Sequence, residues 1–265
     1  MSKVRWFAFI ASVLLSAITQ AAPIDHTPWD QLLKAHVMSG NGGKSSVVDY
    51  RSMQSEQKKL DAYLSLLSSV TPESFDRLSQ SDQLALLINA YNAWTVKLIL
   101  TAWPDLESIK DLGGLFSSPW SKEFVSLLGK TRTLDDIEHK LIRGSGRYND
   151  PRIHFAVNCA SIGCPALRAE AYTGDKLDQQ LDEQTVRFLA DRSRNRVESD
   201  VIKLSSIFKW YREDFEKGWH GFNRLEDFLL AHAEDLGLSN SMVKKLKNGD
   251  ADIEFLDYDW RLNKK

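Results

Sequence analysis

Apolar residues recur at helical spacing along most of the chain. Gaps of three and four residues place them on one face, a pattern typical of amphipathic helices. We expect helices over 29–37, 55–67, 81–101, from Thr133 onward, over 174–190, from Ser205 or Ser206 to Gly218, and over 223–237. Residues 81–101 are apolar on most sides, so this helix should be central and buried.

Strand signals are fewer and shorter than helix signals. Short apolar or alternating runs predict strands at 47–50, 124–127, 131–134, 152–158, 201–204 and 252–258. Together the patterns predict an α+β fold, mostly helical, with a small, largely antiparallel sheet. Since no long linker rich in Pro, Gly or Ser divides the chain, we expect a single globular domain over 45–265 after a lead-in over 22–44.

The first 21 residues have a different character from the rest. Lys3 and Arg5 form a basic start, an apolar run extends from Trp6 to Ile18, and small residues precede a cleavage point after Ala21. This is the pattern of a secretory signal peptide. The run is shorter than the roughly 20 residues that cross a bilayer, so we expect no stable membrane span in the mature chain. The protein should be exported: periplasmic in a Gram-negative bacterium, otherwise secreted.

Composition and charge exclude several classes of function for this protein. Of 265 residues, 43% are apolar and 26% charged, the balance of an ordinary folded domain. A net charge of −2 gives no basic surplus, so no nucleic-acid partner is expected. The chain has two cysteines and lacks HExxH, CxxC and glycine-rich phosphate motifs, so we expect no metal and no cofactor. The sequence indicates no oligomeric state, and its ligand is an unknown small molecule or peptide.

Both cysteines lie in one segment, residues 151–165. The strand expected at 152–158 carries His154 and Asn158 on one face and leads into a small-residue turn with Cys159 and Cys164. The cysteines either form a disulfide, as an exported pair can, or Cys159 is a thiolate nucleophile activated by a histidine. On a regular strand His154 and Cys159 face opposite ways, which counts against their direct pairing.

A carboxylate interrupts the apolar stripe of the helix that starts at Thr133. Glu138 falls among the apolar positions 134, 137, 141 and 142. A buried carboxylate is costly unless it is hydrogen-bonded or paired, so Glu138 should be buried with a partner. It is either half of a structural ion pair or a catalytic acid. His139, beside the stripe, is either a structural histidine or a general base.

Two asparagines, Asn89 and Asn92, share a face of the helix over 81–101. Buried amides must find hydrogen-bond partners. They either tie a loop from within or donate to a substrate carbonyl or oxyanion. Farther along, Trp210 and Asp214 are spaced to wall a cleft, although aromatic residues at helical spacing are usually core.

These four motifs, in this order, resemble the family called domain of unknown function 547. The resemblance covers about residues 45–220. The matching segments are INAYNA at 88–93, LDDIEHKLIR at 134–143, PRIHFAVNCASIGCP at 151–165 and IFKWYREDF at 207–215, with Val48-Asp49-Tyr50 as a typical opening. It implies that the candidate residues belong to family motifs and assigns them no role. Exported bacterial members are common in this family.

Two functions of different class stay open. One is a cofactor-free, thiol-dependent hydrolase or acyltransferase, papain-like or transglutaminase-like, acting on a small peptide-like substrate. Its residues would be Cys159 as nucleophile, His154 or His139 as base, Glu138 as orienter, and Asn158 or Asn92 as donor. The other is a non-catalytic envelope module that binds a ligand or protein, with Cys159 and Cys164 bridged. In both, we expect the polar motifs to converge on one cleft, because buried polar groups are best tolerated as a network.

Overall fold

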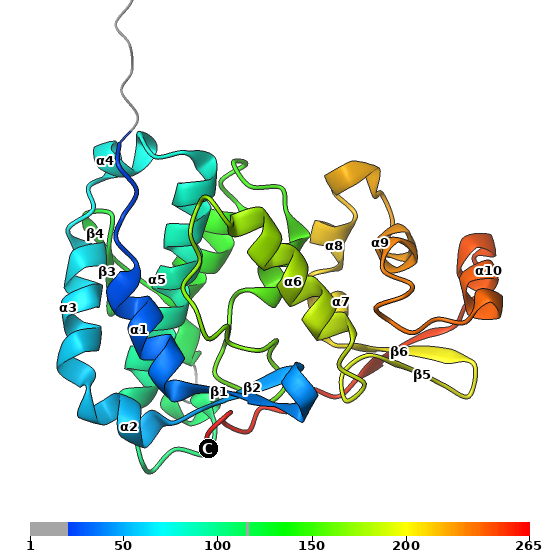
Figure 1. The fold of residues 1–265 in the computed structure, drawn as a ribbon, viewed down its shortest axis with the longest axis horizontal. Coiled ribbons are helices and arrows are strands. Elements are labelled where there is room, and N and C mark those ends of the chain that lie inside the picture. Colours follow the sequence, from blue (N-terminus) through cyan, green and yellow to red (C-terminus); the bar gives the residue numbers. More distant parts are fainter. Residues whose placement is uncertain (1–20, 115–116) are drawn as a thin grey trace, which may run out of the picture.

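The structure, a computed structural model, describes residues 21–114 and 117–265. The expected signal peptide, residues 1–21, lies outside the described residues except for Ala21. The fold is α+β and mostly helical, as the sequence predicts (Figure 1). None of the helices in the described part of the chain has the length and apolar character needed to cross a membrane.

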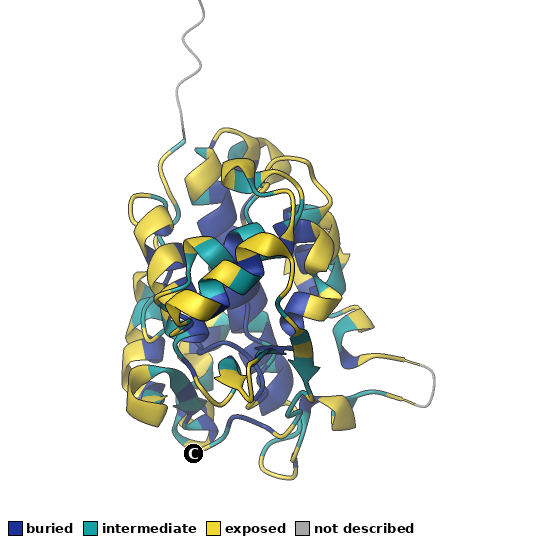
Figure 2. Ribbon diagram, turned by 90° about the vertical axis from the view of Figure 1, so that its right-hand side faces the viewer, coloured by how far each residue is buried: buried dark blue, intermediate teal, exposed yellow. Residues whose placement is uncertain are grey.

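The N-terminal half packs helices around one central helix. Its helices are α1 (Thr27–His36), α2 (Tyr50–Ser55), α3 (Gln57–Ser68), α4 (Pro72–Asp76) and α5 (Gln80–Leu100). Ser79 caps α5 by accepting the N–H of Asp82 at 3.0 Å. Every residue from Gln83 to Ala93 is buried, which confirms the central helix expected at 81–101. Helix α3 packs on α5 and α1 on α3. Figure 2, viewed from the opposite end of the molecule, shows helices of the C-terminal half that expose one face and bury the other.

The C-terminal half has its own aromatic core. Its helices are α6 (Leu177–Leu189), α7 (Ile207–Trp210), α8 (Arg212–Phe215), α9 (Leu225–Ala231) and α10 (Asn240–Asn248). The core includes Phe155, Phe188, Phe208, Phe215 and Phe228. Beside it lies a sheet of β5 (Arg196–Glu198), β6 (Val201–Ser205) and β7 (Ile253–Leu256). Strands β5 and β6 are antiparallel, whereas β6 and β7 are parallel.

Two hairpins and the C-terminal segment complete the fold. The hairpins are β1 (Val37–Gly40) with β2 (Ser45–Val48), and β3 (Val125–Leu127) with β4 (Lys130–Arg132). After β7 the chain returns to the N-terminal half, where Val48 bridges Lys264 and Ser161 bridges Leu262. The Tyr50 hydroxyl donates to Asn263 Oδ1 at 2.7 Å. The end of the chain thus passes directly beside the turn that contains both cysteines.

Three local expectations are corrected. The strand expected at 152–158 is instead the 3₁₀ helix η5 (Pro151–Phe155), because Pro151 fits a first helical position and Asp150 caps the N–H of Arg152. The helix expected from Ser205 or Ser206 to Gly218 is divided at Tyr211 into α7 and α8. The helix expected over 223–237 ends at Ala231, and its capping pair is Arg224 with Asp227.

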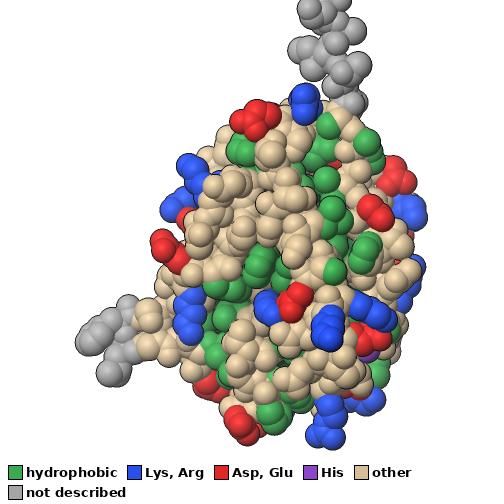
Figure 3. Space-filling view, turned by 90° about the vertical axis from the view of Figure 1, so that its left-hand side faces the viewer, with side chains coloured by type: hydrophobic (Ala, Val, Ile, Leu, Met, Phe, Trp, Pro, Cys, Tyr) green, Lys and Arg blue, Asp and Glu red, His purple; other side chains and the backbone are tan. Residues whose placement is uncertain are grey.

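Charges of both signs are interspersed over the face that carries α1 and α3 (Figure 3). This agrees with the small net charge of −2.

Candidate functional site

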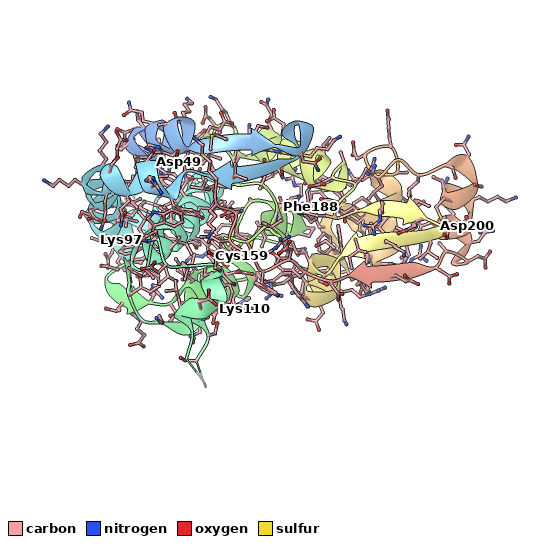
Figure 4. The ribbon with its side chains drawn as sticks, turned by 90° about the horizontal axis from the view of Figure 1, so that it is seen from below. Asp49, Lys97, Lys110, Cys159, Phe188 and Asp200 are labelled. Atoms are coloured by element: carbon pink, nitrogen blue, oxygen red, sulfur yellow. A yellow bond between two sulfur atoms is a disulfide. The ribbon has the colours of Figure 1, made fainter. Side chains whose placement is uncertain are left out.

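A cavity of about 200 Å³ lies where the two halves meet. Cys159, in its wall, sits near the middle of the molecule, between the helical body around Lys97 and the C-terminal half around Phe188 (Figure 4). Six aromatic residues line it: Tyr91, Trp120, Trp210, Tyr211, Tyr258 and Trp260. The titratable lining residues are Asp135, Glu138, His139 and His154, and the disulfide Cys159–Cys164 completes the wall.

Glu138 reaches the cavity from η4 (Asp136–Arg143), a π-helix. Thr133 starts this helix as predicted: its hydroxyl accepts the N–H of Asp136 at 2.9 Å, and the Asp136 carboxylate accepts the N–H of Thr133 at 3.0 Å. In a π-helix residues five apart are stacked, so Ile137 and Ile142 face the core together. The side chain of Glu138 is confirmed as buried, at 5% exposure.

One oxygen of Glu138 is unsatisfied. Its Oε1 is buried and has no hydrogen-bond partner among the described residues, although hydrogen bonding to the Glu138 side chain is among the causes that raise the pKa of Tyr91 and of Tyr211. The expectation of a buried, hydrogen-bonded Glu138 therefore holds for the residue but not for this oxygen. Burial and the nearby Glu138 carboxylate together raise the pKa of Tyr91 and of Tyr211. Both hydroxyls therefore keep their protons near this acid.

His154 is held by a carboxylate 60 positions away in the sequence. Its Nε2 lies 2.8 Å from Asp214 Oδ2, and the ring stacks on Tyr211 at 3.9 Å between centroids. Because Asp214 also accepts from Arg143 at 2.5 Å and Lys217 at 2.6 Å, it is an ionised acceptor and His154 Nε2 carries the proton. The other ring nitrogen, Nδ1, is buried and has no partner in the described part of the chain.

Burial and hydrogen bonding set the charges of this pair. Burial lowers the pKa of His154 and outweighs the opposing hydrogen bond to Asp214. Burial alone would raise the pKa of Asp214, but hydrogen bonds from His154, Arg143 and Lys217 hold it well below its ordinary range. A neutral histidine oriented by a carboxylate, with one nitrogen free, has the arrangement of a general base.

His139 is more exposed than His154 and differently bonded. Arg143 donates to its Nδ1 at 2.9 Å, so the lone pair of that nitrogen is engaged. Its Nε2 lies 3.7 Å from Asp135, whose own pKa is raised by burial. The contact with Arg143 makes His139 a weaker candidate for the base than His154.

The two sulfurs of the disulfide have different surroundings. Cys164 is buried at 3% exposure, whereas Cys159 is partly exposed to the cavity. The Cys164 Sγ accepts the N–H of Cys159 at 2.9 Å and the hydroxyl of Tyr258 at 3.3 Å. The Ser161 hydroxyl lies 3.4 Å from the same sulfur. The disulfide, one of two alternatives left open by the sequence, is thus present, and Cys159 is its accessible sulfur.

The three asparagines are outside the cavity lining and support it from behind. The amide of Asn92 donates to the Ala156 carbonyl at 3.0 Å and accepts the Asn158 N–H at 2.8 Å. Asn158 in turn accepts the N–H of Ala160 at 2.9 Å and donates to Pro165 at 2.8 Å. Asn89 pairs in the same way with the backbone of Tyr172. Helix α5 thus anchors the segment that leads to Cys159.

The structure also adds residues to the site. The sequence predicts Asp214 only as a wall residue of a cleft, together with Trp210. The structure shows that Asp214 is the hydrogen-bond partner of His154. Trp120, Tyr258 and Trp260 arrive from η3 (Pro119–Ser121) and the C-terminal segment. No local pattern in the sequence singles these three residues out. Within residues 21–114 and 117–265, no group of three or more His, Cys, Asp or Glu could hold a metal ion.

A family model matches part of the chain that forms this cavity. The model described as "Protein of unknown function, DUF547" matches residues 75–189, which include α5, η4 and the disulfide turn. Helices α7 and α8 and the C-terminal wall of the cavity lie beyond the matched segment. No curated protein and no solved structure matches the chain.

Proposed function

The chain belongs to the DUF547 family through residues 75–189, and since that description assigns no activity, we propose a function from the chemistry of the cavity. It is a cofactor-free, thiol-dependent hydrolase or acyltransferase for a small peptide-like substrate. Cys159 is the nucleophile once the disulfide is open. The observation that carries this proposal is the free Nδ1 of His154, buried in the cavity wall that also contains Cys159, with Nε2 held by Asp214.

Each residue has a role in the reaction. His154 Nδ1 takes the proton from the Cys159 thiol, and the thiolate attacks the acyl carbon of the substrate. The proton passes from His154 to the leaving amine or alcohol, which leaves an acyl thioester on Cys159. Water or an acceptor amine, deprotonated by His154, attacks the thioester and releases the thiol. Asp214 is the positioning residue for His154, a role that the sequence suggested for Glu138.

Tyr258 is suited to stabilise the oxyanion formed in this attack. Its hydroxyl lies 3.3 Å from Cys159 Sγ, and burial raises its pKa, so it keeps its proton at neutral pH. A positioned hydroxyl donor at the reacting carbon is a common means of stabilising a tetrahedral intermediate.

Activation requires an external thiol. Its thiolate attacks Cys159 Sγ, the exposed sulfur; the disulfide bond breaks, and Cys164 leaves as a thiolate. A second external thiolate displaces the first from Cys159, which yields the external disulfide and a free Cys159 thiolate. The N–H of Cys159 and the hydroxyl of Tyr258, both bonded to Cys164 Sγ, favour Cys164 as the leaving group.

A second candidate function is a non-catalytic binding module of the envelope. The closed disulfide favours it, because a bridged Cys159 has no nucleophile to offer. The cavity would then hold a ligand without transforming it.

The variants Cys164→Ser and Cys159→Ser distinguish the two candidates. With p-nitrophenyl acetate as acyl donor, Cys164→Ser should release a stoichiometric burst of p-nitrophenol without reductant, and the wild type only after reduction. Cys159→Ser is the matched control and should give no burst. His154→Gln in the Cys164→Ser background should slow the burst by about 100-fold, the usual effect of losing a general base. If Cys164→Ser acylates no faster than Cys159→Ser, the binding module is the better proposal.

We also propose that the protein is exported, cleaved after Ala21, and active outside the cytoplasm. The basic start and short apolar run of residues 1–21 support this, and so does the disulfide, since disulfides persist in oxidising compartments. N-terminal sequencing of the exported protein should begin at Ala22. A sequence that begins at Met1 would contradict the proposal.

A further inference from the structure

The cavity that contains Glu138 has a negative charge that nothing in its described wall neutralises. Its acids are Glu138 and Asp135, and no described Lys or Arg lines it. Neither lining histidine donates a hydrogen bond to Glu138: His154 Nε2 is bonded to Asp214, and His139 Nδ1 accepts from Arg143. Arg143, just behind the wall, is committed to Asp214.

Aromatic rings line the same cavity. Trp210 stacks on Trp260 at 5.7 Å between centroids, and Tyr258 and Trp120 contact Trp260 at 4.5 and 5.6 Å. The faces of such rings attract cations, most strongly for tryptophan. The protein already uses one of them in this way, because Lys110 Nζ lies 3.8 Å from the centre of a Trp260 ring.

The unsatisfied oxygen indicates where a cation would bind. Glu138 is 5% exposed, and its Oε1 has no hydrogen-bond partner in the described chain; His139 Nδ1 lies 4.0 Å from it. A buried carboxylate oxygen without a donor is destabilising, and the remedy is a charged N–H donor from outside the chain. A primary ammonium supplies both the charge and the hydrogen bonds, whereas a quaternary ammonium supplies only the charge.

We propose that this cavity binds a small molecule with a primary ammonium group, its nitrogen on Glu138 and its carbon skeleton against the Trp210–Trp260 wall. The inference rests on the proposed function in taking this cavity as the substrate site. It deepens that function by assigning the substrate class: an acyl compound that bears a free amine.

The test uses calorimetric titration of the disulfide-closed wild-type protein, so it needs no thiol chemistry. The probes are 2-phenylethylammonium and its neutral analogue 2-phenylethanol, which has nearly the same shape. The ammonium should bind at least about tenfold more tightly, the effect expected of one charge-assisted hydrogen bond. Tetramethylammonium, which cannot donate, should bind more weakly than 2-phenylethylammonium.

Three variants assign the binding to the cavity. Glu138→Gln keeps the shape and removes the charge, and it should lower affinity for the ammonium about tenfold without changing affinity for the alcohol. Trp210→Leu changes a side chain that is 47% exposed, so folding should survive while affinity for the ammonium falls several-fold. Asp178→Asn, which removes an acid far from the cavity lining, is the matched control and should bind like the wild type.

The inference is overturned if the ammonium and the alcohol bind equally, if neither binds, or if Glu138→Gln binds like the wild type. These outcomes are separate from those that test the proposed function. Acylation of Cys159 without any preference for amines would leave the function standing and remove this inference. Ammonium binding without acylation would keep this inference and support the binding module.

Discussion

Two buried charged residues, Arg152 and Glu138, differ in whether the chain supplies partners for them. Both side chains are nearly inaccessible, at 4% and 5% exposure. Arg152 is paired with Asp150 at 2.7 Å, Asp178 at 2.7 Å and Asp182 at 2.5 Å. It also lies over the ring of Trp219 at 4.8 Å. Glu138 has an oxygen with no partner among the described residues.

The difference separates charges that hold the fold from charges that the fold leaves available. The chain neutralises Arg152 with its own carboxylates, so nothing from outside is needed there. At Glu138 Oε1 and His154 Nδ1 the chain leaves buried polar atoms without hydrogen-bond partners, which destabilises the folded state. Other buried side-chain atoms, such as Trp29 Nε1 and Tyr172 Oη, also lack partners in the described chain, so neither burial nor a missing partner identifies the site by itself. What distinguishes this cavity is that an acid and a histidine with unsatisfied atoms line it together.

Removing Arg152 from its cluster of carboxylates should have the largest effect on the stability of the protein. Arg152→Met should lower the free energy of unfolding by about 3 kcal/mol, because it removes the common partner of three carboxylates. Urea denaturation at neutral pH measures this. Asp178→Asn should cost less than about 1 kcal/mol, because that carboxylate is 86% exposed. If Arg152→Met is as stable as the wild type, Arg152 is not a charge that stabilises the fold.

Asn92, like Arg152, is a buried polar residue whose partners the chain itself supplies, but it is uncharged. Asn92→Ala should lower the free energy of unfolding by about 2 kcal/mol, since it leaves the Ala156 carbonyl and the Asn158 N–H without their partners. Thermal melting followed by circular dichroism checks this value. Thr101→Ala, on the exposed end of α5, serves as the control and should melt near the wild type. A loss of stability no greater in Asn92→Ala than in this control would contradict the anchoring role.

Removing the charge of Glu138 should stabilise the protein, in contrast to the changes at Arg152 and Asn92. Glu138→Gln keeps an acceptor oxygen for its neighbours but removes a buried charge, so it should raise the free energy of unfolding by about 1 kcal/mol. The same urea measurement applies. A loss of several kcal/mol would mean that Glu138 is a structural residue like Arg152 and that its free oxygen is not held for a ligand.

Much of the helical framework follows from the sequence because its apolar periodicity agrees with its packing. Leu60, Tyr63, Leu64 and Leu67 of α3 are all buried as their spacing predicts. The burial of Glu138 follows from the same reasoning. The π-helical register of η4 does not, because a pattern read at 3.6 residues per turn places Leu141 on the core face, where the structure leaves it partly exposed.

The site depends on contacts that local patterns do not encode. The segment 152–158 has the apolar residues of a strand, but Pro151 and the Asp150 cap direct it into η5, which removes the alternation argument against pairing His154 with Cys159. The His154–Asp214 contact and the aromatic wall join segments far apart in the chain. Only tertiary packing reveals which buried polar atoms are left without partners.

The pH dependence of stability should come from the cavity rather than from Arg152. Burial lowers the pKa of His154, so below about pH 6.5 the unfolded chain binds a proton that the folded protein excludes. The free energy of unfolding should therefore fall as the pH falls, by at most about 1.4 kcal/mol per pH unit for one proton. Burial also lowers the pKa of His26 to about 4, which adds a loss of the same sign, so the comparison is made in a His26→Gln background.

Adding His154→Gln should flatten the dependence of the free energy of unfolding on pH between pH 7 and 5.5, because Asp214 is still held by Arg143 and Lys217. Adding Arg152→Met instead should lower stability equally at both pH values. An unchanged slope in the His154 variant would show that this histidine is not kept neutral by burial, and the base assigned to it would be lost.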